Sequence, residues 1–378
     1  MKKTVSIFII FLFLCMSGIA AEPIKNLKLA IFDNPQIDAN NSTLSQSLQD
    51  SYMQGIATAI YVANERGILI NKKTFLYGNS LLNIIQQVPN VKLWKPDAII
   101  GLYTSNAALM SRSLFSDQLV LSITASDNEL TKLPPNFYSL GTPDLYSVNE
   151  LTKFISQHYP NRNLFLCVGA ESKESVGFAN LFTIAYKKIN PKLLIHQTRF
   201  LTDDLNDENI SSLVKGYKPG DIILLFSISG YNAQINLINK ISDSLSPNKL
   251  IFFTVVDNWQ GQKLPGNVND TNNPYVAYRL DALYVDRKDP IYLDFVRNFE
   301  RINHAKPIDN ISFITYRTVM SIITALEMYP PPKRLNTQQA ILWSYQQALK
   351  YNPNWFRTMQ LAIFKLESDK EVFFEKLS

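Results

Sequence analysis

Short apolar runs alternate with longer amphipathic stretches along nearly the whole chain from residue 27 onward. The runs have the length and β-branched content of buried strands, and the stretches between them repeat apolar residues at helical spacing. This alternation is typical of βαβ units, so it predicts an α/β fold with parallel sheets. The expected strands are 27–32, 74–77, 97–101, 118–123, 164–168, 193–200, 221–226, 250–256 and 358–366, and the expected helices are 44–66, 81–88, 107–115, 148–158, 176–189, 208–215, 233–242, 290–304, 312–329 and 337–351.

The pattern stops at Gly141-Thr142-Pro143 and then begins again, which predicts two lobes of similar architecture. A chain of 378 residues exceeds one ordinary domain, and its aliphatic and aromatic content is ample for two cores. Residues 260–274 are rich in Asn, Gly and Pro and show no periodicity, so we expect a loop there.

The first twenty residues have the three parts of a secretory signal peptide. Lys2 and Lys3 form a positive region, residues 5–16 an apolar core, and residues 17–23 a small-residue cleavage region. We expect a signal peptide over residues 1–20, cleaved after Ala20 or Ala21, and export to the periplasm. A retained membrane anchor is the alternative, but the apolar run is short for a bilayer, and no later run is long enough to span one.

Charge and cysteine content argue against several classes of function. The formal net charge of +5 falls to +3 when Lys2 and Lys3 leave with the signal peptide, and the remaining basic residues are scattered among acidic ones. Such a balance gives no basis for binding nucleic acid. Cys15 lies in the predicted signal peptide, so Cys167 remains alone and cannot form an intrachain disulfide. Its apolar surroundings predict a buried strand residue that behaves as a small apolar side chain.

Motifs of the common catalytic and metal sites are missing from the sequence: it has no Gly-x-Ser-x-Gly, phosphate loop, His-Glu-x-x-His or Cys-x-x-Cys. Its three histidines, His158, His196 and His304, fall in separate predicted elements. The acidic residues at 203–208 lack the glycine and the terminal glutamate of a calcium loop, so a solvated loop is the better interpretation. We therefore expect no enzyme activity, no cofactor and no bound metal.

Two neighbouring predicted strands each end in a cluster of hydroxyl side chains. Thr104 and Ser105 follow the strand that ends at Gly101, and Ser122 and Thr124 stand at the end of the next strand. The carboxyl ends of parallel strands share one edge of the sheet, and the free N–H groups at a helix start attract anions. These residues predict a small-ligand site that favours a carboxylate. Capping of the helix by Thr104 or Ser105 is the alternative explanation.

Five groups of residues follow one another along the chain: Tyr52-Met-Gln-Gly-Ile-Ala-Thr-Ala-Ile with Asn64-Glu-Arg-Gly67, Pro96-Asp-Ala-Ile-Ile-Gly101 with Thr104-Ser105, Ser122-Ile-Thr-Ala-Ser126, Phe137-Tyr-Ser-Leu-Gly-Thr-Pro-Asp144, and residues 310–327 with Tyr316 and Ile322-Ile-Thr-Ala-Leu-Glu. In these groups and their order the chain resembles the type I periplasmic binding proteins of the leucine/isoleucine/valine-binding kind. These are the solute receptors of ABC importers. The resemblance covers essentially the whole mature chain.

This resemblance implies two Rossmann-like lobes with parallel sheets, joined by a hinge of three crossings near residues 143, 277 and 354. Residues 22–143 and 277–353 then form lobe one, and residues 144–276 and 354–378 form lobe two. It also implies a ligand site between the lobes, at the carboxyl ends of the strands.

The ligand contacts that the resemblance implies come from both lobes. In lobe one, two loops hold the ligand carboxylate, and the matching positions are Thr104, Ser105, Ser122, Thr124 and Ala125. In lobe two, Tyr231 matches an aromatic contact and Asp257 an ammonium-binding carboxylate, with Ser229 beside Tyr231. Asp257 is equally explained as a loop cap. Tyr103 and Tyr146 either line the cleft or cover a core edge.

The function that the resemblance implies is that of a non-catalytic periplasmic receptor. It would capture a small polar solute, an amino acid or amide, for an ABC permease, and act as a monomer or weak dimer. The alternative is a protein of the same fold that senses a ligand or docks, and signals to a membrane receptor. Leu102 stands where the family often has proline, and Val176-Gly177 where it often has Tyr-Gly, so the identity of the ligand is not carried over.

Overall fold

The computed structural model describes residues 24–33, 42–77, 81–132, 134–170, 173–201, 207–226, 231–245, 250–254, 275–353, 359–366 and 371–377. The chain divides into two compact units, each built from two separate stretches of sequence. Unit 1 comprises Met1–Gly141 and Val285–Thr358, and unit 2 comprises Thr142–Tyr284 and Met359–Ser378. The predicted signal peptide and the predicted loop 260–274 lie outside the described residues.

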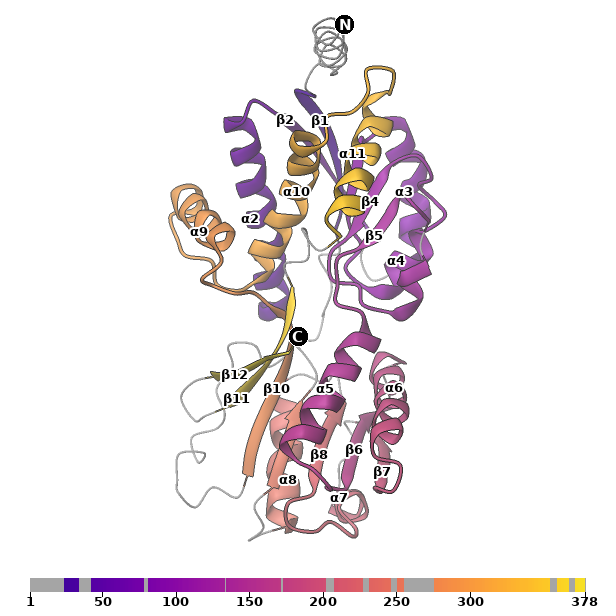
Figure 1. Ribbon diagram of the computed structural model, residues 1–378, viewed down its shortest axis with the longest axis vertical. Coiled ribbons are helices and arrows are strands. Elements are labelled where there is room, and N and C mark those ends of the chain that lie inside the picture. Colours follow the sequence, from indigo (N-terminus) through magenta and orange to yellow (C-terminus); the bar gives the residue numbers. More distant parts are fainter. Residues whose placement is uncertain are drawn as a thin grey trace, which may run out of the picture. The chain divides into compact units, whose positions relative to one another are not determined.

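Unit 1 contains a five-stranded parallel sheet in the order β2-β1-β3-β4-β5 (Figure 1). Its strands are β1 (Asn26–Asp33), β2 (Leu69–Leu76), β3 (Ala98–Gly101), β4 (Leu119–Ser122) and β5 (Phe137–Ser139). The central strands β3 and β4 have only four residues each, and all of them are buried. Burial on both faces explains why these two strands read as continuous apolar runs in the sequence.

Helices cover both faces of this sheet (Figure 1). The helices of unit 1 are α2 (Ser42–Glu65), α3 (Leu81–Trp94), α4 (Ser105–Ser111), α9 (Pro290–Asn303), α10 (Ile311–Met328) and α11 (Thr337–Tyr351), with a short 3-10 helix η1 at Asn128–Lys132. Helix α9 packs on α2 and α10 and does not cover the sheet directly. Helices α3 and α4 pack on one face, where Ile84 and Ala107 join a core cluster around Phe32. Helices α2, α10 and α11 lie on the other face.

Helices α2 and α10 pack closely where Gly55 of α2 faces α10. A Cβ atom at Gly55 would lie 2.0 Å from Thr315 Oγ1 and 2.2 Å from the Ser312 carbonyl oxygen. Thr315 Oγ1 also lies 3.3 Å from the carbonyl oxygen of Tyr52 in α2, in hydrogen-bonding geometry. Most of α10 is buried. This close approach therefore fixes the position of α10 against α2 in the interior of unit 1.

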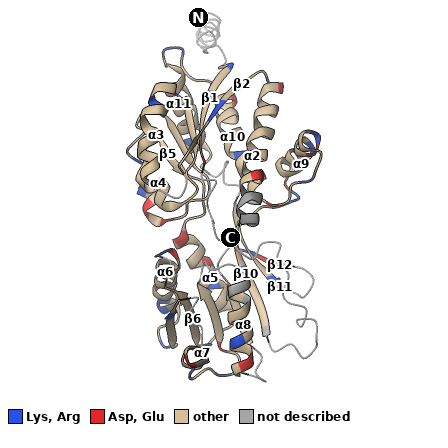
Figure 2. Ribbon diagram, turned by 180° about the vertical axis from the view of Figure 1, so that it is seen from behind, with Lys and Arg blue, Asp and Glu red and all other residues tan. Residues whose placement is uncertain are grey.

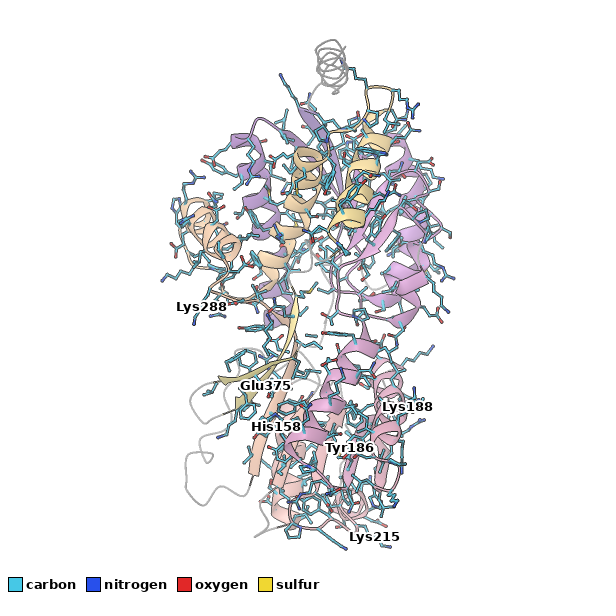
Figure 3. The ribbon with its side chains drawn as sticks, in the orientation of Figure 1. His158, Tyr186, Lys188, Lys215, Lys288 and Glu375 are labelled. Atoms are coloured by element: carbon cyan, nitrogen blue, oxygen red, sulfur yellow. The ribbon has the colours of Figure 1, made fainter. Side chains whose placement is uncertain are left out.

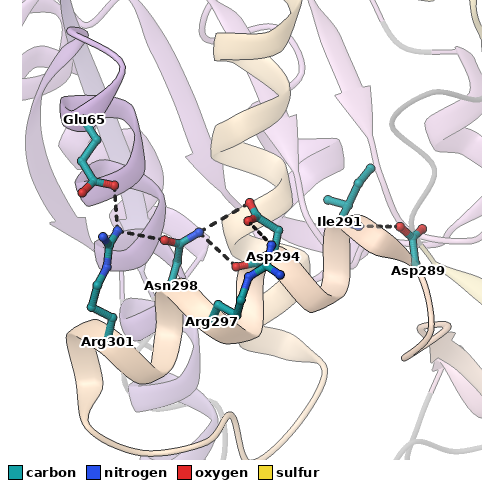
Figure 4. A network of polar contacts seen from close by, with 7 residues as sticks. All are labelled: Glu65, Asp289, Ile291, Asp294, Arg297, Asn298 and Arg301. Carbon is teal, nitrogen blue, oxygen red and sulfur yellow. Dashed lines mark hydrogen bonds and ion pairs between the residues drawn. The ribbon is translucent and has the colours of Figure 1, made fainter.

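Helix α9 is joined to α2 by exposed polar contacts (Figure 4). Arg301 Nη2 of α9 lies 2.7 Å from Glu65 Oε2 of α2. Within α9 itself, the Asp289 side chain caps the first turn by accepting the Ile291 N–H at 2.8 Å. Exposed ion pairs contribute only about 0.2–1 kcal/mol. The buried Phe295 of α9 therefore contributes more to the attachment.

Unit 2 contains a seven-stranded sheet in the order β12-β11-β10-β9-β8-β6-β7. Its strands are β6 (Leu164–Gly169), β7 (Ile195–Phe200), β8 (Ile222–Phe226), β9 (Leu250–Thr254), β10 (Tyr275–Tyr284), β11 (Gln360–Leu366) and β12 (Glu371–Leu377), and its helices are α5 (Asp144–His158), α6 (Lys173–Ile189), α7 (Asp207–Leu213) and α8 (Tyr231–Leu245). Strands β6 to β10 are parallel to one another, whereas β11 pairs with β10 and β12 in antiparallel fashion.

An aromatic cluster holds α5 against the antiparallel edge of this sheet. His158 at the end of α5 lies between Phe154 and Phe374, with ring centroids 4.3 and 5.7 Å away. Its Nε2 lies 2.9 Å from Glu375 Oε2 of β12, and Figure 3 shows these two side chains close together. His158 is therefore explained by packing within unit 2.

The predicted α/β fold class is confirmed, and several elements differ in detail from those expected. Helix α3 continues through Pro89 instead of ending before it, because Ile84 and Val91 on either side are both buried and hold their turns against the core. Strands β5, β10 and β12 were not expected, and the pairing of β11 and β12 is antiparallel. The unit boundaries follow Gly141, Tyr284 and Thr358, so the crossing expected near residue 277 falls within β10.

Cys167 is buried in β6, where its solvent exposure is 0%. Burial raises the pKa of its thiol far above the usual value, so the reactive thiolate form is suppressed. Within the described ranges, none of the helices has both the length and the apolar character needed to cross a membrane.

Candidate functional site

The chain makes an unusual turn immediately after β3. Gly101 has φ +116°, and a Cβ atom there would lie 2.1 Å from the Phe32 carbonyl oxygen of β1, so only glycine fits. The next residue, Leu102, is fully buried and has a left-handed φ of 57°. Such a backbone is strained for leucine. Ser122 at the end of β4 holds the turn by donating its Oγ hydrogen to the Leu102 carbonyl oxygen at 2.7 Å.

Further side-chain hydrogen bonds join the loop after β3 to the loop after β4. Thr124 Oγ1 donates to the Tyr103 carbonyl oxygen at 2.9 Å. Ser105 Oγ accepts the backbone N–H groups of Ser126 and Asp127, at 3.2 and 3.1 Å. The structure thus brings the two predicted hydroxyl clusters together, and the hydroxyl groups of Ser105, Ser122 and Thr124 bond to the opposite loop.

The remaining predicted residues of these loops also have structural partners. Thr104 is the N-cap of α4, where its Oγ1 accepts the Ala107 N–H at 3.2 Å, as the capping alternative predicts. Ala125 is buried, and its carbonyl oxygen accepts a hydrogen bond from Ser139 Oγ. A Cβ atom at Gly141 would lie 2.2 Å from that same carbonyl oxygen, so the β5 strand end approaches this loop closely.

The Ser126 side chain is a candidate that the predicted set omits. It lies half-buried in the loop after β4, and its backbone N–H bonds to Ser105. Among the described residues, no partner engages its hydroxyl group. The paired loops therefore leave a hydroxyl at the carboxyl edge of the sheet that is able to bind a small polar group.

A buried acid lies beside the loop after β3. Asp33 ends β1 and is 3% exposed. Its Oδ1 accepts the Tyr103 hydroxyl at 3.2 Å, and its Oδ2 accepts the Gln49 side-chain N–H at 3.0 Å. The Tyr103 ring in turn packs edge-on against Tyr52, with centroids 4.5 Å apart. Burial raises the pKa of Tyr103 well above its usual value, and the neighbouring Tyr52 and the Asp33 carboxylate raise it further, so its hydroxyl stays protonated as a donor.

Asp33 was not predicted from the sequence, although a signal was present. Asp33 and Tyr103 each stand at or near the end of an apolar run, as Tyr77 does after β2. The expected first strand ended at residue 32, which left Asp33 to a loop. Only the parallel register of β1 with β2 and β3 places these three positions at one edge of the sheet.

The predicted contacts of unit 2 are less fully described. Ser229 and Asp257 lie outside the described residues, and Tyr231 is the first residue of α8, with its side chain outside them. Tyr146 is 43% exposed in the first turn of α5. Its backbone N–H donates to the Pro143 carbonyl oxygen at 2.9 Å.

Buried polar pairs do mark the carboxyl end of β9 in unit 2. Thr254 Oγ1 donates to Gln234 Oε1 at 3.1 Å, and both residues are buried. Across the strand pair, Arg279 stands opposite Thr254. Its Nη1 lies 3.1 Å from Asp281 Oδ2, and its guanidinium stacks 4.9 Å above the Phe364 ring centroid. These contacts make a fixed polar edge within unit 2.

Charges of both signs are spread over the two units (Figure 2). Within the part of the chain that the structure describes, no three His, Cys, Asp or Glu residues form a group that could hold a metal ion.

Neither a protein-family model nor a curated protein matches the sequence. Solved structures do match the fold. A leucine-binding protein of Thermotoga maritima is 13% identical, with a TM-score of 0.66 over 93% of this chain and 99% of its own. A branched-chain amino acid transporter substrate-binding protein of Streptococcus pneumoniae, in complex with isoleucine, is 14% identical, with a TM-score of 0.66 over 93% and 99%. A solute-binding protein of an ABC transporter from R. palustris, in complex with benzoate, is 12% identical, with a TM-score of 0.64 over 93% and 96%. The chain has the fold of the type I periplasmic binding proteins, as predicted.

Proposed function

We propose that the protein is a non-catalytic solute-binding protein that captures a small polar ligand at the carboxyl edge of its sheets. The observation that carries this proposal is the pair of hydrogen-bonded loops after β3 and β4. Their contacts hold the loops rigidly, and a rigid polar site loses little conformational entropy when a ligand binds. The likeness in fold to amino acid-binding proteins supports the same function.

Two kinds of residue serve this site. Ser105, Ser122 and Thr124 hold the loops through their side chains, so their effect on the ligand is through the backbone that they position. Ser126 and Tyr103 offer hydroxyl groups at the same edge. From unit 2, the contacts that we propose are Tyr146, Ser229, Tyr231 and Asp257, the positions that the family resemblance assigns.

We propose that the protein is exported and that it delivers its ligand to a membrane protein. Removal of the predicted signal peptide releases the chain into the periplasm, where it passes its ligand to an ABC permease. The alternative is a sensor of the same fold that reports ligand occupancy to a membrane receptor. Recovery of the tagged protein from crosslinked membranes separates the two, because a permease identifies an importer and a signalling receptor identifies a sensor.

Equilibrium dialysis of refolded, ligand-free protein tests the binding function. A panel of amino acids, amides and small amines is expected to contain a ligand of about micromolar affinity, which corresponds to roughly 8 kcal/mol. Ser126→Ala and Thr124→Val are expected to weaken that binding. Ser116→Ala is the matched control, because Ser116 is exposed and its side chain bonds, within the described residues, to its neighbour Asp117. The absence of binding to every compound in the panel contradicts the proposal.

A further inference from the structure

The carboxyl edge of the unit 1 sheet holds one carboxylate and three tyrosine hydroxyl groups. We call Asp33, Tyr52, Tyr77 and Tyr103 the acidic tyrosine cluster. Tyr77 follows β2, and its ring lies 6.5 Å from that of Phe32, the residue before Asp33. Its backbone N–H also donates to the Asp33 carbonyl oxygen at 3.1 Å. The four residues therefore come from the ends of three neighbouring strands and from α2.

Asp33 has no cationic partner among the described residues. The donors to its two oxygen atoms are the Tyr103 hydroxyl and the Gln49 amide, and both are neutral. A buried carboxylate is costly unless a positive charge or several hydrogen bonds compensate for its desolvation. Two hydrogen bonds occupy about half of the positions at which a carboxylate accepts hydrogen bonds. The site thus has capacity for a further donor, and a positive charge is the most favourable one.

Two hydroxyl groups of the cluster are also unsatisfied. Tyr52 and Tyr77 are each 1% exposed, and neither hydroxyl has a hydrogen-bond partner in the described part of the chain. The Tyr52 hydroxyl lies near the Tyr103 hydroxyl, and the Tyr77 hydroxyl lies near the Tyr103 backbone N–H, but neither contact has good hydrogen-bond geometry. Burial raises the pKa of both hydroxyls well above the usual value, and the Asp33 charge raises each further. Buried polar groups without partners are uncommon in folded proteins, and a bound water, ion or ligand is one explanation for them.

We propose that the acidic tyrosine cluster binds an ammonium group of the solute, so that the ligands are amines such as basic amino acids. This inference rests on the proposed solute-binding function and narrows its substrate class. An ammonium group has three donors, which match one Asp33 oxygen and the oxygens of Tyr52 and Tyr77. The surrounding aromatic rings favour a cation as well. A water molecule would satisfy the hydroxyls but would leave the carboxylate without a counter-charge.

Calorimetric titration of the refolded protein with two matched compounds tests the inference. L-lysine carries a side-chain ammonium group, and L-norleucine has the same chain without it. We expect L-lysine to bind at least tenfold more tightly than L-norleucine. Asp33→Asn keeps the shape of the side chain and removes its charge, so it should lower the affinity for L-lysine at least tenfold and leave L-norleucine within about twofold. Asp97→Asn is the control, because Asp97 binds the Lys28 N–H before β3, at the opposite end of the strand.

A second variant keeps the test decisive if Asp33→Asn does not fold. Tyr77→Phe removes an unpartnered hydroxyl and retains the ring, so the ligand-free protein should be at least as stable as the wild type. The same variant should bind L-lysine several-fold more weakly. The inference is overturned if the wild type binds the two compounds equally. It is also overturned if Tyr77→Phe and Asp33→Asn both bind L-lysine with wild-type affinity. Either result leaves the proposed solute-binding function intact. The failure of every solute to bind overturns both proposals.

Discussion

The buried carbonyl oxygen of Leu102 accepts a hydrogen bond from Ser122 Oγ at 2.7 Å, while Leu102 itself has a left-handed φ of 57°. A left-handed backbone costs a residue such as leucine about 1–2 kcal/mol. The hydrogen bond compensates for part of this strain and joins the end of β4 to the loop after β3. The positions of Tyr103 and Thr104 depend on this link.

Ser122→Ala is expected to lower the free energy of unfolding by about 1–3 kcal/mol, because it leaves the buried Leu102 carbonyl without its donor. Urea unfolding of the ligand-free protein measures the loss. Ser116→Ala, at an exposed position, should change the stability by less than about 0.5 kcal/mol. Equal effects of the two substitutions would contradict the structural role of Ser122.

Gly55→Ala is expected to destabilise unit 1, because the new Cβ atom would overlap Thr315 Oγ1 and the Ser312 carbonyl oxygen of α10. Overpacking of this kind costs about 1–3 kcal/mol. Gly177→Ala provides the opposite case: Gly177 lies inside α6, and a Cβ atom there would meet nothing within 4 Å. That variant should gain about 0.5–1 kcal/mol from helix propensity. Thermal unfolding of the two variants should therefore shift in opposite directions.

Asp281→Asn is expected to cost about 1.5–3 kcal/mol, because it removes the charge of one member of the buried ion pair with Arg279. The same substitution at Asp294 removes an exposed pair with Arg297 and should cost less than about 1 kcal/mol. Denaturant unfolding of both variants gives the comparison. A small effect at Asp281 would mean that the ion pair contributes little to the polar edge of unit 2.

Buried tyrosines make the stability depend on alkaline pH. Burial raises the pKa of Tyr186 to about 12, against about 10 in the unfolded chain. The contribution of this group is fully present below pH 10 and is lost between about pH 10 and 12, since only the unfolded chain gives up the proton there. The loss is about 1.4 kcal/mol per pH unit for one tyrosine. Tyr186→Phe should therefore show a shallower fall in unfolding free energy above pH 10 and an unchanged slope from pH 7 to 9.

The sequence predicted most of the fold because its signals are local. The buried strands β3, β4 and β8 are continuous apolar runs, and helices such as α6 and α11 repeat apolar residues at regular spacing. Strand β12 was missed because its mixture of Glu, Lys and Phe has no clear period. The helix before Pro89 was predicted to end too early. Burial of residues on both sides of Pro89 outweighs the helix-breaking preference of proline.

The candidate site was predicted in part. Thr104, Ser105, Ser122 and Thr124 were identified as a group at two strand ends, and the structure brings them together. Their partners could not be predicted, because the Ser122 and Thr124 bonds join residues about twenty positions apart. Asp33 was missed for the same reason: its importance depends on Tyr103, seventy positions along the chain.

Mass spectrometry of protein purified without denaturation tests the central claim most directly. We predict one small molecule bound per chain, released on unfolding and carrying an amine group, and the refolded protein should bind that compound again. Protein that carries no small molecule, and that binds none from a periplasmic extract after refolding, would contradict the claim that this chain is a solute-binding protein.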